Sequence, residues 1–190
     1  MRNQNISNLQ LMVLSSFFAA LIAIGAQLVI PLPFVPITLQ TFFVLLASVF
    51  LGGFRGSLSI FIYLLIGIAG FPVFSSGTSG LGVILGPTGG YLYSFLIASI
   101  IVGVISDKIF LKYDSPSLKS LALLFVACLL GSMIILAIGT IHLMIFVNLS
   151  PEVAFFSGFF PFILGDVVKS LAVALVMSQI YTKRPIQNTT

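Results

Sequence analysis

The chain has 190 residues, of which 59% are hydrophobic and only 6% are charged. Soluble domains carry about 25% charged residues, so this composition excludes a water-soluble protein and indicates an integral membrane protein. Apolar runs of about 20 residues favour membrane-spanning helices over the alternating strands of a barrel. We therefore expect one all-α domain over residues 1–190, a membrane-embedded bundle of six transmembrane helices.

Six apolar segments are expected to span the bilayer. In chain order they are Asn8 to Ile30, Thr38 to Phe54, Gly56 to Gly70, Thr88 to Phe110, Ser117 to Val147 and Phe159 to Tyr181. The apolar run of the first exceeds the roughly 7 to 15 residues of a signal-peptide core, so it is interpreted as a membrane helix.

Basic residues divide the connections into two classes. All but Lys169 fall at the two termini and in or at the edge of the second and fourth connections: Arg2, Arg55, Lys108, Lys112, Lys119, Lys183 and Arg184. The positive-inside rule then places both termini in the cytoplasm. Orientation and contact with anionic lipid of the bilayer account for the net charge of +4, so no nucleic-acid partner is expected.

Two connections on the opposite side have unusual compositions. The first, residues 31–37, is stiffened by prolines and delivers Thr38 and Gln40 to the outer end of the second helix. The third, Phe71 to Gly90, is rich in glycine and serine and is longer than the roughly 12 to 15 residues beyond which loops are usually functional or disordered. Its apolar residues favour a lid over a pocket, although a mobile outer loop is the alternative.

One basic residue breaks the partition. Lys169 lies roughly 12 Å along the last helix from Pro161, and Asp166 precedes it on the same helix face. A charge at that depth costs at least about 2.5 kcal/mol, so the pair is a candidate functional site, with a purely structural ion pair as the alternative. Asp166 could accept hydrogen bonds from N–H donors of a ligand, and Lys169 could neutralise an anion.

Neighbouring residues could complete such a site. Gln40 and Thr38 could add neutral hydrogen bonds, and four aromatic side chains could enclose an apolar ring or chain: Tyr91, Tyr93, Phe71 and Phe74.

Small residues recur along the first helix at Ser15, Ala19 and Ala23. This spacing lets another helix approach closely, which predicts either a docking surface for a partner or packing within the same bundle.

Catalytic, metal and nucleotide motifs are not expected. There is no phosphate-binding loop, so any ATP must be hydrolysed by another protein, and the single histidine, His142, and single cysteine, Cys128, offer neither metal nor cofactor ligands. Gly77 to Gly80 matches the short pattern of rhomboid-like proteases with Ser79 as nucleophile, and Gly165-Asp166 is similar to intramembrane aspartyl proteases. His142 could serve as the base for Ser79, but Pro87 separates Ser79 from the next helix, where the resemblance would require the serine to stand beside the histidine. The aspartyl match lacks a second carboxylate, so we expect no enzyme.

Four blocks of sequence resemble the signature stretches of the BioY family, the biotin-specific substrate-capture (S) components of prokaryotic energy-coupling factor (ECF) transporters. They are Pro36 to Thr41, Gly70 to Phe74, Gly86 to Tyr91 and Pro161 to Lys169. The resemblance spans nearly the whole chain. It implies a multi-pass protein of the cytoplasmic membrane that binds biotin from outside and needs a transmembrane coupling protein and two cytoplasmic ATPases.

The resemblance also implies roles for particular residues. The Gly165, Asp166 and Lys169 face of the last helix would bind biotin, together with the third block, which includes Gly89, Gly90 and Tyr91; Ala19 and Ala23 would dock on the coupling protein. Asp166 would meet the ureido ring and Lys169 the carboxylate, or Lys169 would only orient Asp166 and leave the carboxylate to backbone N–H groups of the third connection. An S component for another vitamin, and a self-sufficient carrier with Asp166 as proton site, are the alternatives.

Overall fold

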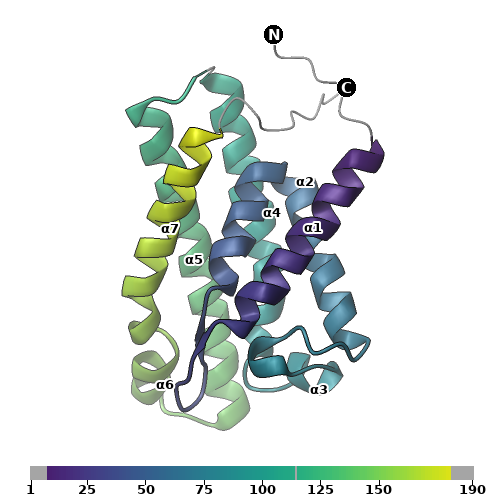
Figure 1. Cartoon of the computed structure of the whole chain (residues 1–190). Helices are drawn as coiled ribbons and strands as arrows, with labels where there is room; N and C mark the ends of the chain where they lie inside the picture. Colours follow the sequence, from purple (N-terminus) through teal and green to yellow (C-terminus); the bar gives the residue numbers. More distant parts are fainter. Residues whose placement is uncertain (1–7, 114, 181–190) are drawn as a thin grey trace.

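The computed structural model describes residues 8–113 and 115–180, which form a bundle of helices running side by side (Figure 1). Five helical segments of these residues are long and apolar enough to cross a membrane: Asn8–Gln27, Gln40–Ile68, Gly89–Lys112, Leu118–Val147 and Pro151–Gln179. The first, with 20 residues, is about 30 Å long, which matches the hydrocarbon core of a bilayer. The expected all-α membrane bundle is confirmed.

Helix α2 (Gln40–Ile68) folds back on itself at Gly52, whose φ of 84° and ψ of −179° are not helical. A Cβ at Gly56 would lie 2.8 Å from the Cα of Ser48, and the Gln40 amide donates to the Tyr63 hydroxyl at 2.6 Å. The two halves therefore lie side by side. The expected break between the second and third segments, placed at Arg55, falls instead at Gly52, where a positive φ favours glycine.

A carboxylate from another helix lies at this bend. The backbone N–H of Gly53 donates to Oδ2 of Asp107, which is on α4 (Gly89–Lys112), at 3.2 Å. The first N–H groups of a helix carry partial positive charge, so the anion stabilises the start of the second half of α2.

The remaining long helices begin and end close to the expected residues. Helix α1 (Asn8–Gln27) ends before the expected Ile30, because Val29 and Ile30 enter a strand. Helix α5 (Leu118–Val147) starts at a Ser117 capping box and ends at Asn148 in the left-handed conformation. Helix α7 (Phe160–Gln179) is the expected last helix, and Tyr181 lies outside the described residues.

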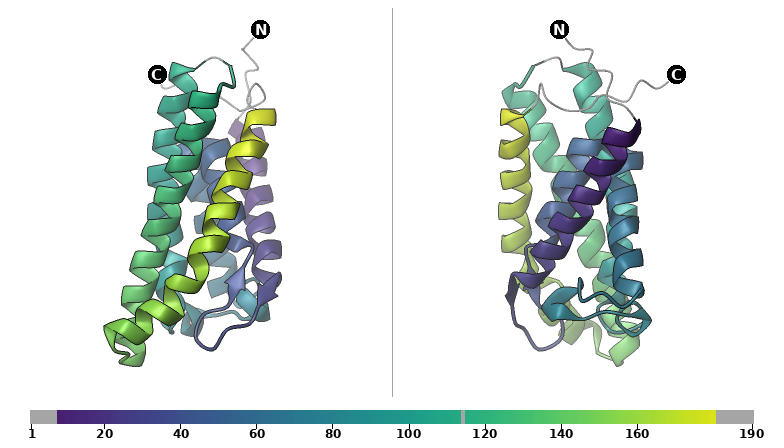
Figure 2. Two further views of the ribbon diagram at one scale, coloured as in Figure 1. Left: turned by 90° about the vertical axis from the view of Figure 1, so that its left-hand side faces the viewer. Right: turned by 45° about the vertical axis from the view of Figure 1, so that its right-hand side comes forward.

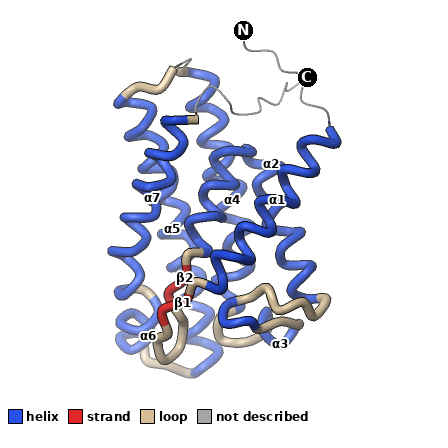
Figure 3. The backbone as a smooth tube through the Cα atoms, viewed as in Figure 1, coloured by secondary structure: helices blue, strands red, loops and turns tan. Residues whose placement is uncertain are grey.

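The connections at one end of the bundle contain short elements that the sequence did not predict. Strands β1 (Val29–Ile30) and β2 (Ile37–Thr38) pair antiparallel, and η1 (Ser75–Gly77) and α3 (Leu81–Ile84) lie in the third connection. Helix α6 (Pro151–Gly158), capped by Ser150, precedes α7. Figures 2 and 3 show these elements at the end of the bundle opposite the start of α1 and the end of α7.

The surface is apolar and the interior holds small and polar residues. Large apolar side chains such as Phe54 and Leu164 are exposed, whereas Ser48 and Ser99 are buried and hydrogen-bond to each other between α2 and α4 at 2.8 Å. Gly53 and Gly103 let the same two helices approach closely. This distribution suits packing in lipid, where small residues rather than apolar burial bring helices together.

Candidate functional site

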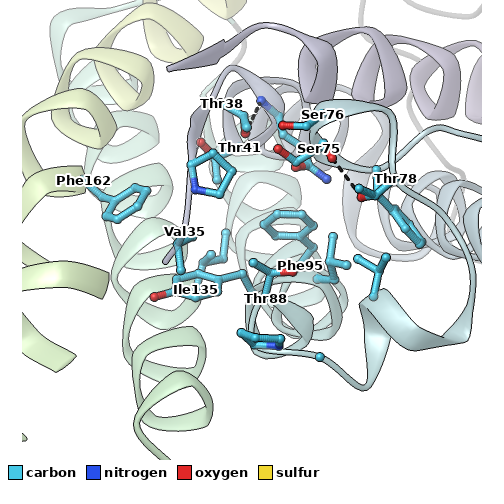
Figure 4. Close-up of a pocket in the computed structure, with 18 of the residues that line it drawn as sticks. Val35, Thr38, Thr41, Ser75, Ser76, Thr78, Thr88, Phe95, Ile135 and Phe162 are labelled. Atoms are coloured by element: carbon cyan, nitrogen blue, oxygen red, sulfur yellow. Dashed lines mark hydrogen bonds between the residues drawn. The ribbon is translucent and has the colours of Figure 1, made fainter. Parts of the chain in front are cut away.

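A cavity of about 410 Å³ lies at the end of the bundle that carries the short elements, between these elements and the long helices (Figure 4). This volume is in the range of small-molecule sites. Three groups of residues form its wall. They are Val35, Pro36, Thr38, Gln40 and Thr41 of the first connection, β2 and α2; Phe74, Ser75, Ser76, Thr78, Gly82, Val83, Gly86, Pro87 and Thr88 of the third connection; and Tyr91, Leu92, Phe95, Ile135, Leu136, Phe162, Asp166 and Lys169 of the helices.

The charged part of the wall is a cluster of three side chains from α2 and α7. Nζ of Lys169 donates to Oδ1 of Asp166 at 3.1 Å and to Oγ1 of Thr41 at 2.8 Å. The Thr41 hydroxyl in turn lies 3.4 Å from the same Asp166 oxygen. The expected common face of Asp166 and Lys169 is confirmed, and the pair is nearly dry, with side chains 2% and 12% exposed.

Two buried polar atoms of the wall have no protein partner. One is Oδ2 of Asp166 and the other is Oγ of Ser75; in the described residues they are the only buried side-chain oxygen or nitrogen atoms in this condition. An unpaired buried acceptor costs roughly 1 to 3 kcal/mol, and more for a charged group, so each marks a position where a ligand donor would be favourable.

Aromatic and aliphatic side chains form the rest of the wall. Phe74 is fully buried and packs edge-on against Tyr63 at 5.5 Å, and Tyr91 lies 6.3 Å from Phe162 between ring centroids. The Tyr91 hydroxyl is used within the protein, since it donates to the Gly158 carbonyl at 2.8 Å. Tyr91 therefore presents an apolar ring to the cavity.

The third connection is fastened to the bundle at both of its ends. The Gln27 amide of α1 donates to the carbonyl of Phe74 at 3.1 Å. On the other side, Nε2 of His142 on α5 lies 2.9 Å from the carbonyl of Gly86, and Nδ1 lies 2.8 Å from the Tyr93 hydroxyl. Because a carbonyl only accepts, Nε2 carries the proton and Nδ1 of a neutral ring accepts from Tyr93.

The structure brings only part of the predicted set to the cavity. Asp166, Lys169, Gln40, Thr38, Tyr91 and Phe74 border it. Phe71 is 61% exposed and does not border the cavity, and the Tyr93 hydroxyl contacts His142. Gly89 and Gly90 are buried but contribute no wall, since Gly90 packs against the His142 side chain.

Most wall residues that the sequence did not single out come from the third connection and from α2. Thr41 is the most consequential, and a signal for it was present, because it adjoins Gln40 at the polar start of a membrane helix. The third connection was expected to act as a lid, but its sequence has no periodicity that would identify individual wall residues. Ser75, Ser76, Thr78 and Thr88 were therefore not predicted.

The small residues of α1 are mostly enclosed within the chain. Ser15 is fully buried and contacts the Arg55 carbonyl at 3.4 Å, and Ala19 is 2% exposed. Ala23 is partly exposed.

The geometry gives no support to the protease patterns. Both ring nitrogens of His142 are engaged with Tyr93 and Gly86, not with Ser79. The partner of Asp166 is a lysine rather than a second carboxylate. No group of three or more His, Cys, Asp or Glu side chains in the described part of the chain could hold a metal.

A helical bundle with an apolar surface and a partly polar pocket at one end has the architecture of a membrane protein that binds a small molecule. The sequence profile of the BioY family matches residues 1–185. The chain belongs to the BioY family, as the four sequence blocks predicted.

Named relatives agree with this assignment. A probable biotin transporter of Lysinibacillus sphaericus is 38% identical, covering 90% of this chain and 86% of the relative. The biotin transporter of Thermotoga maritima is 36% identical over 87% of this chain and 92% of its own. The crystal structure at 2.1 Å of the S-component for biotin from an ECF-type ABC transporter has a TM-score of 0.85 and 26% identity, and covers 97% of each chain. These relatives are transporters, so the expectation of a transport protein rather than an enzyme is confirmed.

Proposed function

We propose that this chain binds biotin in the described cavity and acts as the biotin-specific S component of an ECF transporter. The observation that carries the proposal is the buried, unpartnered Oδ2 of Asp166 at the cavity wall. A ureido ring offers N–H donors to such an oxygen, while the apolar ring and chain of biotin fit the aromatic wall. The family and its biotin-transporting relatives support the same ligand.

Within this proposal, Lys169 mainly orients Asp166. Its ammonium already donates to Oδ1 of Asp166 and to Thr41, which leaves Oδ2 as the free face of the carboxylate. This arrangement favours the second of the two sequence-based assignments, in which the ligand carboxylate lies away from Lys169.

Equilibrium binding of biotin to the purified, detergent-solubilised chain without any partner tests the ligand. We expect tight binding near one biotin per chain, and no comparable binding of other vitamins used as controls. A sample that is folded by thermal unfolding but binds no biotin would refute the assignment, and tight binding of another vitamin would redirect it.

Energy for uptake would come from a coupling protein and two cytoplasmic ATPases. In proteoliposomes we expect biotin uptake only when this module and ATP are both present. Uptake by the chain alone that follows the proton gradient would instead indicate a self-sufficient carrier with Asp166 as its proton site.

We further propose six spans with both chain ends in the cytoplasm of a prokaryotic cell. The two halves of α2 would count as separate spans, and the basic residues Arg55, Lys108, Lys112 and Lys119 all lie at the end of the bundle opposite the cavity. The buried Cys128 gives little background labelling. In intact cells a membrane-impermeant maleimide should therefore label Glu152→Cys at α6, and should label Ser115→Cys only after permeabilisation. The reverse pattern would invert the topology.

The docking surface for the coupling protein is proposed on the outer face of α1. Ala23 is the member of the small-residue stripe that reaches the surface, and Ser16 and Ala20 are exposed beside it at helical spacing. Ser15 and Ala19 would support this surface from beneath by letting α1 pack closely on the bundle.

A further inference from the structure

The charges at the cavity wall already cancel each other. Asp166 and Lys169 are the only charged residues among the described wall residues, and they form an ion pair of 3.1 Å. The other basic residues of the described part lie at the far end of the bundle: Arg55, Lys108, Lys112 and Lys119. The cavity thus holds no surplus positive charge for an anionic ligand group.

An anion beside this pair would be electrostatically unfavourable. A ligand carboxylate on Lys169 would make two carboxylates share one ammonium, leaving a net negative charge in a nearly dry site. Like charges at close range and uncompensated buried charge are both costly. A neutral N–H group at Oδ2 of Asp166 adds no charge and satisfies an unpaired acceptor.

The third connection adds neutral hydroxyl groups to the wall. Ser75, Ser76, Thr78 and Thr88 all border the cavity from the third connection (Figure 4). Oγ of Ser75 is buried without a partner. The Thr78 hydroxyl already donates to the Ser75 carbonyl at 2.8 Å. The Ser75 hydroxyl can donate as readily to an amide or ester carbonyl as to a carboxylate oxygen, so it distinguishes ligands by hydrogen bonding rather than by charge.

We propose that this site does not require the carboxylate charge of its ligand and accepts neutral amides and esters of biotin, including biotin joined to a small amine, about as well as biotin itself. The proposal rests on the proposed function, because it takes the biotin head group as the part bound at Asp166. It makes the hydroxyl-lined third connection the part of the wall that faces the carboxyl end.

Competition binding against labelled biotin tests the proposal directly. Biotin, biotinamide and biotin methyl ester are compared on the same purified chain, with a biotin methylated on a ureido nitrogen as the head-group control. We expect the amide and ester to bind within about fivefold of biotin and the methylated head to lose far more. If the amide and ester are both more than fivefold weaker while biotin binds, the inference fails and the proposed function stands. If biotin itself does not bind, both fail.

A positively charged side chain introduced by substitution into the cavity wall gives an independent test. Thr88 borders the cavity at the start of α4 and has ordinary helical backbone angles, so a longer side chain is tolerated by the backbone there. Thr88→Lys should raise the preference for biotin over biotinamide by about fivefold, as expected for a partly exposed ion pair. The neutral control Thr88→Gln should leave the preference unchanged. An unchanged preference in Thr88→Lys, or an equal gain in Thr88→Gln, would overturn the placement of the carboxyl end beside the third connection.

Discussion

The ammonium of Lys169 donates to the hydroxyl of Thr41 at 2.8 Å, and this bond joins two helices from opposite ends of the sequence. Thr41 is at the start of α2 and Lys169 is in the middle of α7. The bond holds Lys169 beside Oδ1 of Asp166 and leaves Oδ2 of the carboxylate without a protein partner. The most polar part of the cavity is therefore built by tertiary contact as much as by the spacing within α7.

The ion pair should respond unequally to single and double substitutions. Asp166→Asn leaves a buried ammonium without a counter-charge, so we expect a loss of about 3 kcal/mol of stability and at least about tenfold weaker biotin binding. The double variant Asp166→Asn with Lys169→Met should recover much of the stability but not the binding. Thermal unfolding and equilibrium binding measure the two effects, and a double variant less stable than both single variants would contradict this account.

Two glycines of the bundle, Gly103 on α4 and Gly165 on α7, should differ sharply in their tolerance of alanine. A Cβ at Gly103 would overlap the backbone of Gly53, whereas a Cβ at Gly165 would meet no atom within 4 Å. Gly103→Ala should cost about 1 to 3 kcal/mol, because the α2 backbone cannot move aside. Gly165→Ala should be neutral or slightly stabilising, since alanine favours helix. Equal melting temperatures in detergent would refute the proposed close approach of α2 and α4.

His142 should control how fast the ligand leaves. His142→Phe keeps a ring beside Phe146 but removes the bond to the Gly86 carbonyl, which fastens one end of the third connection. Loss of a bond worth about 1 kcal/mol should raise the biotin dissociation rate roughly fivefold.

Tyr93→Phe is the matched control for His142. It removes the hydroxyl bond to Nδ1 but leaves the Gly86 contact, so its dissociation rate should stay near that of the wild type. Identical rates for all three proteins would show that the third connection is not held by His142.

Substitutions on α1 should separate capture from uptake. Ala20→Leu enlarges an exposed residue on the proposed docking face, and Ala137→Leu makes the same change at an exposed residue of α5. Both should bind biotin normally. Only Ala20→Leu should lower ATP-driven uptake in proteoliposomes that contain the coupling module, and equal uptake by the two variants would remove α1 from the proposed interface.

Sequence reasoning located the helices and the Asp166–Lys169 pair because both follow from local rules, namely apolar length and helical spacing. It missed the position of the α2 bend, because the positive φ of Gly52 and the space beside it depend on Asp107, far along the chain. It also assigned Phe71 and Tyr93 to the cavity, because nothing local says which aromatic side chains of a long loop and a helix start turn inward. Thr41 belongs to the site because Lys169 of the last helix donates a hydrogen bond to it, and no local pattern in the sequence predicts that contact.

The hairpin of α2 joins the two ends of the bundle. Its first arm begins at Gln40 and Thr41 on the cavity wall. Its tip, at Gly52 and Gly53, lies at the opposite end of the bundle, where the Gly53 N–H donates to Asp107. The tip and this part of the cavity wall therefore belong to one helix arm. A displacement of the tip transmitted along this arm would move Thr41 relative to Lys169, so the far end of the bundle would be coupled to the polar part of the cavity.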